Sequence, residues 1–152
     1  MTQELTWRSL CPDDFDQWMV LLNTTERFDQ EHERTVRSDL DRLAKEWKLD
    51  VNSIGAFDAE GALLAYGRNG CRPGATDGIT VYLLGGVHPD ARGRGLGRKV
   101  LDWQLQRAGH NVTELCAADP GAADLPAIAA CFVDEQIDSR ARLFAAAGFG
   151  QT

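Results

Sequence analysis

Long apolar runs are missing from this sequence of 152 residues: no stretch approaches the roughly 18 to 20 apolar residues that a membrane span needs. The first residues, MTQELTWRS, are polar and lack the apolar centre of an export signal. Lysine is also scarce, and arginine supplies most of the positive charge, a bias typical of a GC-rich genome. We therefore expect a cytoplasmic protein that does not bind membranes.

Basic residues are outnumbered, and patterns of metal ligands are absent from the sequence. The 23 acidic and 16 basic side chains give a formal charge of −7, and such a field repels nucleic-acid phosphate. The cysteines form no CxxC pair and have no histidine at ligand spacing. We expect no nucleic-acid partner, no metal and reduced, mostly buried thiols at Cys11, Cys71, Cys116 and Cys131.

The sequence does contain the pattern of a single globular domain over residues 1–152. Hydrophobic residues make up 43% of it, enough for one sizeable core. Apolar periodicity and turn residues predict, in chain order, a strand at 5–10, a helix from Pro12, a helix capped by Ser38, strands at 53–57, 62–67 and 79–87, a helix at 95–108 ended by Gly109, a strand at 112–117 and a last helix ending at Gly148. This order predicts an α/β fold, α+β in some schemes, with helices on both faces of a mixed sheet and a parallel crossover from 79–87 to 112–117.

Some segments allow more than one interpretation. The polar residues 24–36 suit a solvated loop or helix face, or a loop that sets specificity. Residues 68–78 suit a loop, and residues 119–133 suit a loop or a short helix. Gly85 and Gly86 near the end of the 79–87 strand indicate a bulge or the close approach of another chain or ligand.

The stretch GVHPDARGRGLGRKVL, residues 86–101, carries positive charge where a helix begins. A helix start has unpaired N–H groups and a partial positive charge, so it normally attracts acidic residues. Glycine-rich turns that enter helices also present several N–H groups to an anion. A bound polyphosphate would reverse the repulsion, so the turn is typical of a phosphate site built with Arg92, Arg94, Arg98 and Lys99.

Two other phosphate motifs fit less well. The P-loop needs GxxxxGK followed by Ser or Thr, which this chain lacks. The dinucleotide fingerprint is GxGxxG in an N-terminal βαβ unit, whereas Gly93, Gly95 and Gly97 give GxGxG after two helices and a hairpin. A dinucleotide site and a tight turn with solvated arginines remain the alternatives.

The segment VHPDARGRGLG resembles the acyl-CoA signature of the GNAT superfamily of N-acyltransferases. The core of that signature is Q or R, x, x, G, x, G or A, met here by Arg92, Gly95 and Gly97 and preceded by a V-x-P at Val87 and Pro89. The late RARLFAAAGF also resembles that family's last helix, so the resemblance covers roughly residues 5–149. Closest in character are bacterial tandem members of the mycothiol synthase-like group.

The resemblance implies a GNAT-like sheet and acetyl-CoA as co-substrate. Backbone amides of residues 93–98 would bind its pyrophosphate, and main-chain groups near Val87 would hydrogen-bond the pantetheine arm. An amine of a small molecule or peptide would then attack the thioester, with positioning and an oxyanion-stabilising N–H as the protein's contribution. The implied coenzyme-binding residues are Val87, His88, Arg92, Gly93, Arg94, Gly95, Leu96, Gly97 and Arg98.

The sequence departs from this family at the catalytic positions. Phe144 stands where the family commonly has a tyrosine acid, and the strand 79–87 lacks the glutamate that often serves as base. Tyr82 and His88 are weak candidates for a catalytic or substrate contact, and Glu31, His32 and Glu33 for the acceptor site. The catalytic residues therefore stay unknown, and a non-catalytic acyl-CoA-binding scaffold is the alternative to an N-acetyltransferase.

The family's last strands have no counterpart in the sequence, because only three residues follow Phe149. We expect the N-terminal part of a longer tandem protein, or an open edge that a second GNAT domain or a homodimer partner covers.

Overall fold

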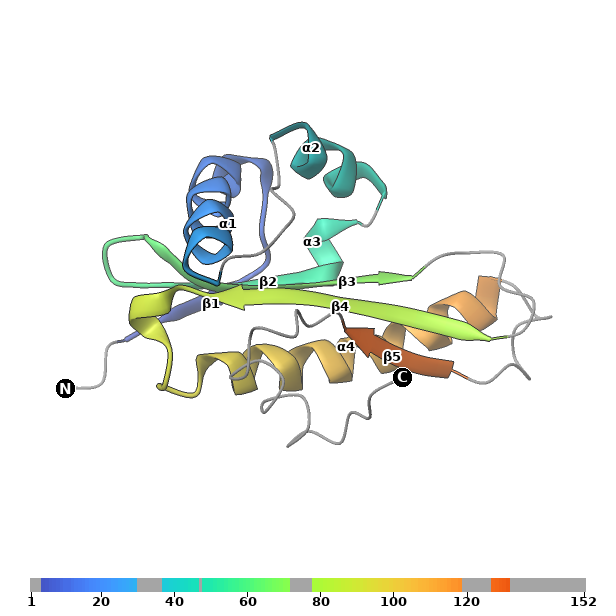
Figure 1. Ribbon diagram of the computed structural model, residues 1–152. Coiled ribbons are helices and arrows are strands. Elements are labelled where there is room, and N and C mark those ends of the chain that lie inside the picture. The colour runs from blue at the N-terminus through green and yellow to red at the C-terminus, as the bar shows by residue number, and fades with distance from the viewer. Residues whose placement is uncertain (1–3, 30–36, 47, 72–77, 119–126, 132–152) are drawn as a thin grey trace.

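A computed structural model describes residues 4–29, 37–46, 48–71, 78–118 and 127–131 of the chain. Its centre is a five-stranded sheet in the order β1-β2-β3-β4-β5, with antiparallel pairing from β1 to β4 and parallel pairing of β4 with β5. Helices α1, α2 and α3 lie over one face, and α4 runs along the other (Figure 1). The predicted α/β class, with a mixed sheet flanked by helices, is confirmed.

The first strand leads into the first helix as the sequence predicts. Strand β1 is Thr6–Arg8, a 3-10 turn η1 spans Pro12–Asp14, and α1 follows over Phe15–Asp29. The apolar stripe of α1 is buried: Phe15, Trp18 and Leu22 are at most 8% exposed, and Trp18 packs edge-on against the Tyr66 ring. The helix is longer than predicted, because Thr25 and Glu26 are buried in it instead of forming a solvated surface.

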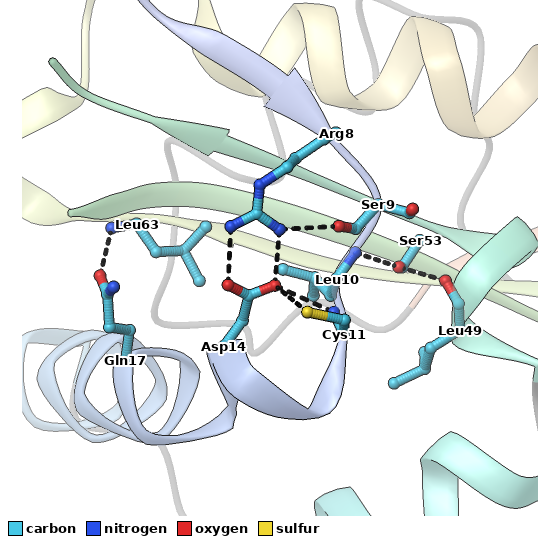
Figure 2. A network of polar contacts seen from close by, with 9 residues as sticks. All are labelled: Arg8, Ser9, Leu10, Cys11, Asp14, Gln17, Leu49, Ser53 and Leu63. Carbon is cyan, nitrogen blue, oxygen red and sulfur yellow. Dashed lines mark hydrogen bonds and ion pairs between the residues drawn. The ribbon is translucent and has the colours of Figure 1, made fainter. Parts of the chain in front are cut away.

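A polar network fixes the entry to α1 (Figure 2). Arg8 donates two hydrogen bonds to the Asp14 carboxylate, at 2.7 and 2.8 Å, and its guanidinium stacks on the Phe57 ring. Asp14 also accepts the Cys11 N–H at 2.9 Å, so that one buried carboxylate joins β1 to η1 directly before α1 begins. Ser53 accepts the Leu10 N–H at 2.9 Å and donates to the Leu49 carbonyl, linking β1 to the next layer.

Two short helices complete this face of the sheet. Helix α2 is Arg37–Glu46, and α3 is Leu49–Asn52. Ser38 was predicted to cap the second helix, but α2 begins one residue earlier and Ser38 lies within its first turn. The predicted core positions Leu40 and Ala44 pack into the apolar cluster of this face.

The predicted hairpin forms from β2, Ser53–Phe57, and β3, Leu63–Cys71. Asp58 shapes its turn by accepting the N–H groups of Glu60 and Ala62 at 2.9 and 2.8 Å. Strand β3 is longer than predicted: residues 68–71, interpreted as loop, continue it opposite β4. Asn69 in this extension is fully buried because α4 supplies its partners.

The second half of the crossover differs from the prediction. Strand β4 is Ile79–Val87 as expected, followed by a 3-10 turn η2 at Pro89–Ala91 and by α4 over Leu96–Ala118. Gly109 does not end the helix, and residues 112–117 are its last turns and not a strand. The parallel partner of β4 is instead β5, Ala127–Cys131, in the segment that the sequence left ambiguous.

The strand glycines lie at close approaches. A Cβ on Gly67 would lie 2.5 Å from Val100 Cγ1, and one on Gly86 would lie 3.2 Å from the Tyr66 ring. Gly85 and Gly86 pair regularly with Gly67 and Tyr66, so they form no bulge against β3. They let α4 and the Tyr66 ring pack close to the sheet, which fixes the height of α4 above β4.

Candidate functional site

The chain leaves β4 through a turn that its own side chains hold. The His88 N–H donates to the Leu64 carbonyl at 2.7 Å, which ties the strand end to β3. His88 Nδ1 accepts the Asp90 N–H at 3.1 Å and thereby caps η2. Both contacts hold the end of β4 and the turn that follows it.

Arginine side chains brace the same turn. Arg92, which is half-buried, donates from Nε to the Val87 carbonyl at 3.1 Å. Arg94 is exposed and donates to the Asp90 carbonyl at 3.4 Å. The contact of Arg92 ties the chain just before α4 back to the last residue of β4.

Gly93 and Gly95 adopt the left-handed conformation, with φ of +81° and +80°. Other residues reach this region only at a cost of roughly 1 kcal/mol or more. A Cβ at either position would meet no atom within 4 Å, so the space in front of both glycines is open. The backbone therefore needs glycine for its conformation, and the turn leaves room for a ligand.

Helix α4 begins at this open turn with no acidic residue in its first turn. The Lys99 N–H donates to the Gly95 carbonyl at 3.1 Å, so the N–H groups of residues 96–98 precede the helical ladder. Leu96 is buried against Ala91 and Val100, which anchors the helix start, while Arg94, Arg98 and Lys99 are exposed around it. Arg98 is held by Asp102 at 3.2 Å. The arrangement suits an anion with several oxygens.

Strand β4 has one edge that β5 covers only in part. Residues 79–83 pair with residues 127–131. From Leu84 to Val87 the strand pairs with β3 alone among the described residues. This stretch leads directly into the turn and offers main-chain groups to an extended ligand that follows the strand.

Helix α4 also fixes the start of that stretch. The Gln104 side chain is buried and donates from Nε2 to the Leu84 carbonyl at 2.9 Å and to the Arg68 carbonyl at 3.3 Å. Asn69 donates to the Gln104 carbonyl at 2.9 Å and to Asn111 at 3.2 Å. A buried amide network thus connects β3, β4 and α4 beneath the site.

The structure brings the predicted coenzyme-binding residues together at one end of β4. Val87, His88 and residues 92–98 form a continuous turn between the strand and the helix. Tyr82 is half-buried further back on β4, on the face that α1, α2 and α3 cover. The predicted acceptor-site residues Glu31, His32 and Glu33 and the late Phe144 lie outside the described residues.

Sequence reasoning missed two buried residues near this site. Thr25 is 3% exposed, and its methyl carbon would lie 3.9 Å from a Cβ on Gly86. Glu26, next to it, is 5% exposed. The signal was present in the spacing, because Trp18, Leu22 and Glu26 follow each other at intervals of four along α1, but the charge of the segment favoured a solvated surface.

Two further expectations concern metals and membranes. Within the described ranges, no group of three or more His, Cys, Asp or Glu side chains could hold a metal ion. None of the described helices is both long enough and apolar enough to cross a membrane.

Solved acetyltransferases share this fold. A GCN5-related N-acetyltransferase from Sphaerobacter thermophilus matches 97% of the chain with a TM-score of 0.72 and 19% identity, although the chain spans only 44% of that protein. A predicted acetyltransferase from Clostridium acetobutylicum, solved with acetyl-CoA, matches 98% of the chain at a TM-score of 0.73 and 12% identity, over 92% of its own length. The aminoglycoside N-acetyltransferase AAC(6')-Iy in complex with CoA matches the whole chain at a TM-score of 0.64 and 17% identity, over 91% of its own length.

The similarity is one of fold and not of sequence. No protein-family model and no curated protein matches the chain. At identities below 25% the matches establish a GNAT-like architecture, as the turn after β4 predicted.

Proposed function

We propose that this chain binds acyl-CoA at the turn between β4 and α4 and transfers the acyl group, most simply acetyl, to an amine. The observation that carries the proposal is the open, glycine-built helix start surrounded by cations where an empty helix would favour acids. The structural neighbours solved with CoA and with acetyl-CoA support the same ligand.

The residues at the turn fit the polar groups of that ligand. The N–H groups of residues 93–98 would receive the pyrophosphate, with Arg94, Arg98 and Lys99 supplying charge. The uncovered edge of β4 from Leu84 to Val87 would hydrogen-bond the pantetheine arm as a strand does. Arg92 and Gln104 keep these two parts at a fixed distance, through the Val87 and Leu84 carbonyls.

The chemistry requires little more than positioning. The bound thioester supplies the carbonyl carbon that the amine attacks, so that a C–N bond forms, the C–S bond breaks and the amine proton ends on the released thiol. An N–H on the β4 edge would stabilise the oxyanion, an effect worth about 3 to 4 kcal/mol in other enzymes. Tyr82 is the titratable side chain within β4 and is our candidate to take or relay the proton.

The proposed acceptor is a small molecule or peptide amine, and the proposed setting is a tandem bacterial protein of the mycothiol synthase-like type. Support for a larger setting comes from the Sphaerobacter thermophilus structure, whose fold match occupies less than half of its length. The departures from the family at Phe144 and on β4 favour the alternative, an acyl-CoA-binding scaffold for a second domain.

A charge-reversed variant tests the binding site. At 100 times its dissociation constant, coenzyme A should stabilise the wild-type protein by about 2.7 kcal/mol. The double variant Arg94→Glu with Gly95→Asp should lose this stabilisation. Its matched control is Arg27→Glu with Gly61→Asp, which reverses an exposed arginine and replaces another left-handed glycine, at φ of +85°, away from the turn.

The control variant should keep the full thermal shift with coenzyme A. Stabilisation by NADH and not by coenzyme A would contradict the proposal in favour of a dinucleotide site. Thiol release from acetyl-CoA with a panel of amines then separates the enzyme from the scaffold, because a scaffold binds the coenzyme and releases no thiol.

A further inference from the structure

An arginine on the opposite face of the sheet has no acidic partner in the described structure. Arg68 lies in β3, where Gly67 and Asn69 face α4 and therefore Tyr66 and Arg68 face α1, α2 and α3. Its side chain is partly buried. Its main-chain carbonyl accepts a hydrogen bond from Gln104, but its guanidinium makes no hydrogen bond or ion pair with the residues that the structure describes.

The described neighbours of Arg68 are either uncharged or positively charged. Its cross-strand neighbours are Ser53 and Leu84, and the next residue of β3 on its face is Gly70, which has no side chain. Burial lowers the pKa of Arg68, the nearby Tyr66 raises it and the Arg42 guanidinium lowers it. Among the described residues, no carboxylate contributes to this balance.

Several other arginines that the structure describes have acidic partners. Arg8 forms a two-bond pair with Asp14, Arg107 bonds Glu114 at 3.0 Å, and Arg98 bonds Asp102 at 3.2 Å. A guanidinium does not lose its proton in a protein, so partial burial without a partner is unfavourable. The position of Arg68 therefore favours an anion that comes from outside the described chain.

The position of Arg68 relative to β4 indicates that this anion belongs to the acceptor substrate. Arg68 pairs directly with Leu84, the first residue of the β4 stretch that β5 leaves uncovered. Both side chains point to the same face of the sheet, away from α4. An acceptor whose amine meets a thioester at this stretch could place a second group on Arg68.

We propose that Arg68 binds a carboxylate of the acceptor, so that the substrate is an amine that also carries a carboxylate, as an amino acid does. The planar guanidinium matches a planar carboxylate with two parallel hydrogen bonds. This inference rests on the proposed function for the reaction itself. The binding of a carboxylate at Arg68 can be tested without turnover.

The first arm of the test measures binding. With saturating coenzyme A, the standard amino acids and their carboxamides are compared by thermal shift on the full chain. At least one amino acid should stabilise the wild-type protein more than its carboxamide, and Arg68→Met should abolish that difference while leaving the coenzyme A shift unchanged. Arg27→Met, an exposed arginine on α1, is the matched control and should keep the difference.

The second arm separates a ligand role from a structural one. Because Arg68 has no described partner to lose, Arg68→Met should leave the melting temperature of the free protein unchanged or raise it. Arg68→Lys keeps the positive charge but loses the two parallel hydrogen bonds of a guanidinium. The difference in thermal shift between an amino acid and its carboxamide should therefore lie between those of the wild type and Arg68→Met. If turnover is measured, Arg68→Met should raise KM for the carboxylated amine tenfold or more, about 1.4 kcal/mol, with little change in kcat.

Several results would overturn the inference. One is a wild-type protein that does not distinguish any amino acid from its carboxamide, and another is an Arg68→Met variant that keeps the distinction. A preference for phosphoethanolamine over every carboxylated amine would replace carboxylate by phosphate. Loss of the coenzyme A shift in the wild-type protein would instead refute the proposed function, so the two failures are distinguishable.

Discussion

At the scale of single residues, the Arg8–Asp14 pair shows how one carboxylate organises the start of the fold. Hydrogen bonds from Arg8 are the main reason that the pKa of Asp14 lies below its ordinary value of 3.8, and burial opposes them. Asp14 is nearly buried, whereas the Arg8 side chain is 46% exposed. Solvent therefore screens part of the attraction to Arg8, and smaller contributions from the Cys11 N–H and thiol also lower the pKa of Asp14.

This geometry predicts a pH-dependent loss of stability in acid. Because the folded-state pKa of Asp14 is lowered, its contribution is present above pH 3.8 and is lost as the pH falls through the lowered value. Asp14→Asn should cost about 1 to 2 kcal/mol at neutral pH, measured by urea unfolding. The difference between variant and wild type should shrink below pH 3.8. An unchanged difference would show that the charge of Asp14 is irrelevant.

The glycine-rich turn between β4 and α4 was predictable at this scale because the residues that form it are close together in the sequence. The left-handed glycines, the reversed charge and the V-x-P all lie within a dozen residues of Val87. The proposed ligand role of Arg68 was not predictable from the sequence. A single arginine in a polar segment indicates no ligand until its pairing with Leu84 and its lack of a described acidic partner are known.

At the scale of elements, α4 is the part that joins the sheet to the site. Its first turn forms the candidate phosphate site, and its middle packs against Gly67 through Val100 and Gln104. Further along, Asn111 continues the buried amide network to Asn52 at 2.9 Å. A displacement of α4 would therefore move both the turn and the uncovered edge of β4.

Two glycine substitutions with opposite expected signs test this packing. Gly67→Ala would put a Cβ 2.5 Å from Val100 and 2.9 Å from Gln104, so it should destabilise the protein by about 1 to 3 kcal/mol and weaken coenzyme A binding. Gly109 lies on the exposed side of α4, and a Cβ added there would meet no atom within 4 Å. Gly109→Ala should stabilise the protein by about 0.5 to 1 kcal/mol.

Thermal or urea unfolding of both variants measures whether each substitution lowers or raises the stability of the protein. Equal effects of the two substitutions would contradict the close packing of α4 on β3. The Gly109 result also tests the length of the helix. If Gly109 ended the helix in the left-handed conformation, its replacement by alanine would destabilise the protein.

The errors of sequence reasoning lie mainly in elements whose partners are distant along the chain. The helix was predicted to end at Gly109, but Asn111 has a buried partner in β3, so α4 continues to Ala118. Strand β3 was predicted to stop at residue 67, but Asn69 gains hydrogen bonds from residues 35 and 42 positions away. Strand β5 was missed because its residues, AIAAC, have no alternation that distinguishes a strand from a helix.

At the scale of the whole molecule, the two faces of the sheet have separate roles in this account. The cationic turn at the start of α4 is the proposed coenzyme site, and Arg68, on the face under α1, α2 and α3, is the proposed acceptor contact. Each is a local positive region in a chain with a formal charge of −7. The surrounding negative charge disfavours polyanions and leaves these regions to small anionic ligands.

A residue-by-residue map of coenzyme binding tests the proposed pyrophosphate site most directly. Backbone amide NMR signals of the full chain are followed during titration with coenzyme A and, separately, with pantetheine, which lacks the pyrophosphate. If the pyrophosphate binds at the start of α4, coenzyme A shifts the amide signals of Gly93 through Arg98 most strongly and pantetheine leaves them unchanged. Equal shifts with both compounds, or shifts confined to other parts of the chain, would contradict a pyrophosphate site at the start of α4.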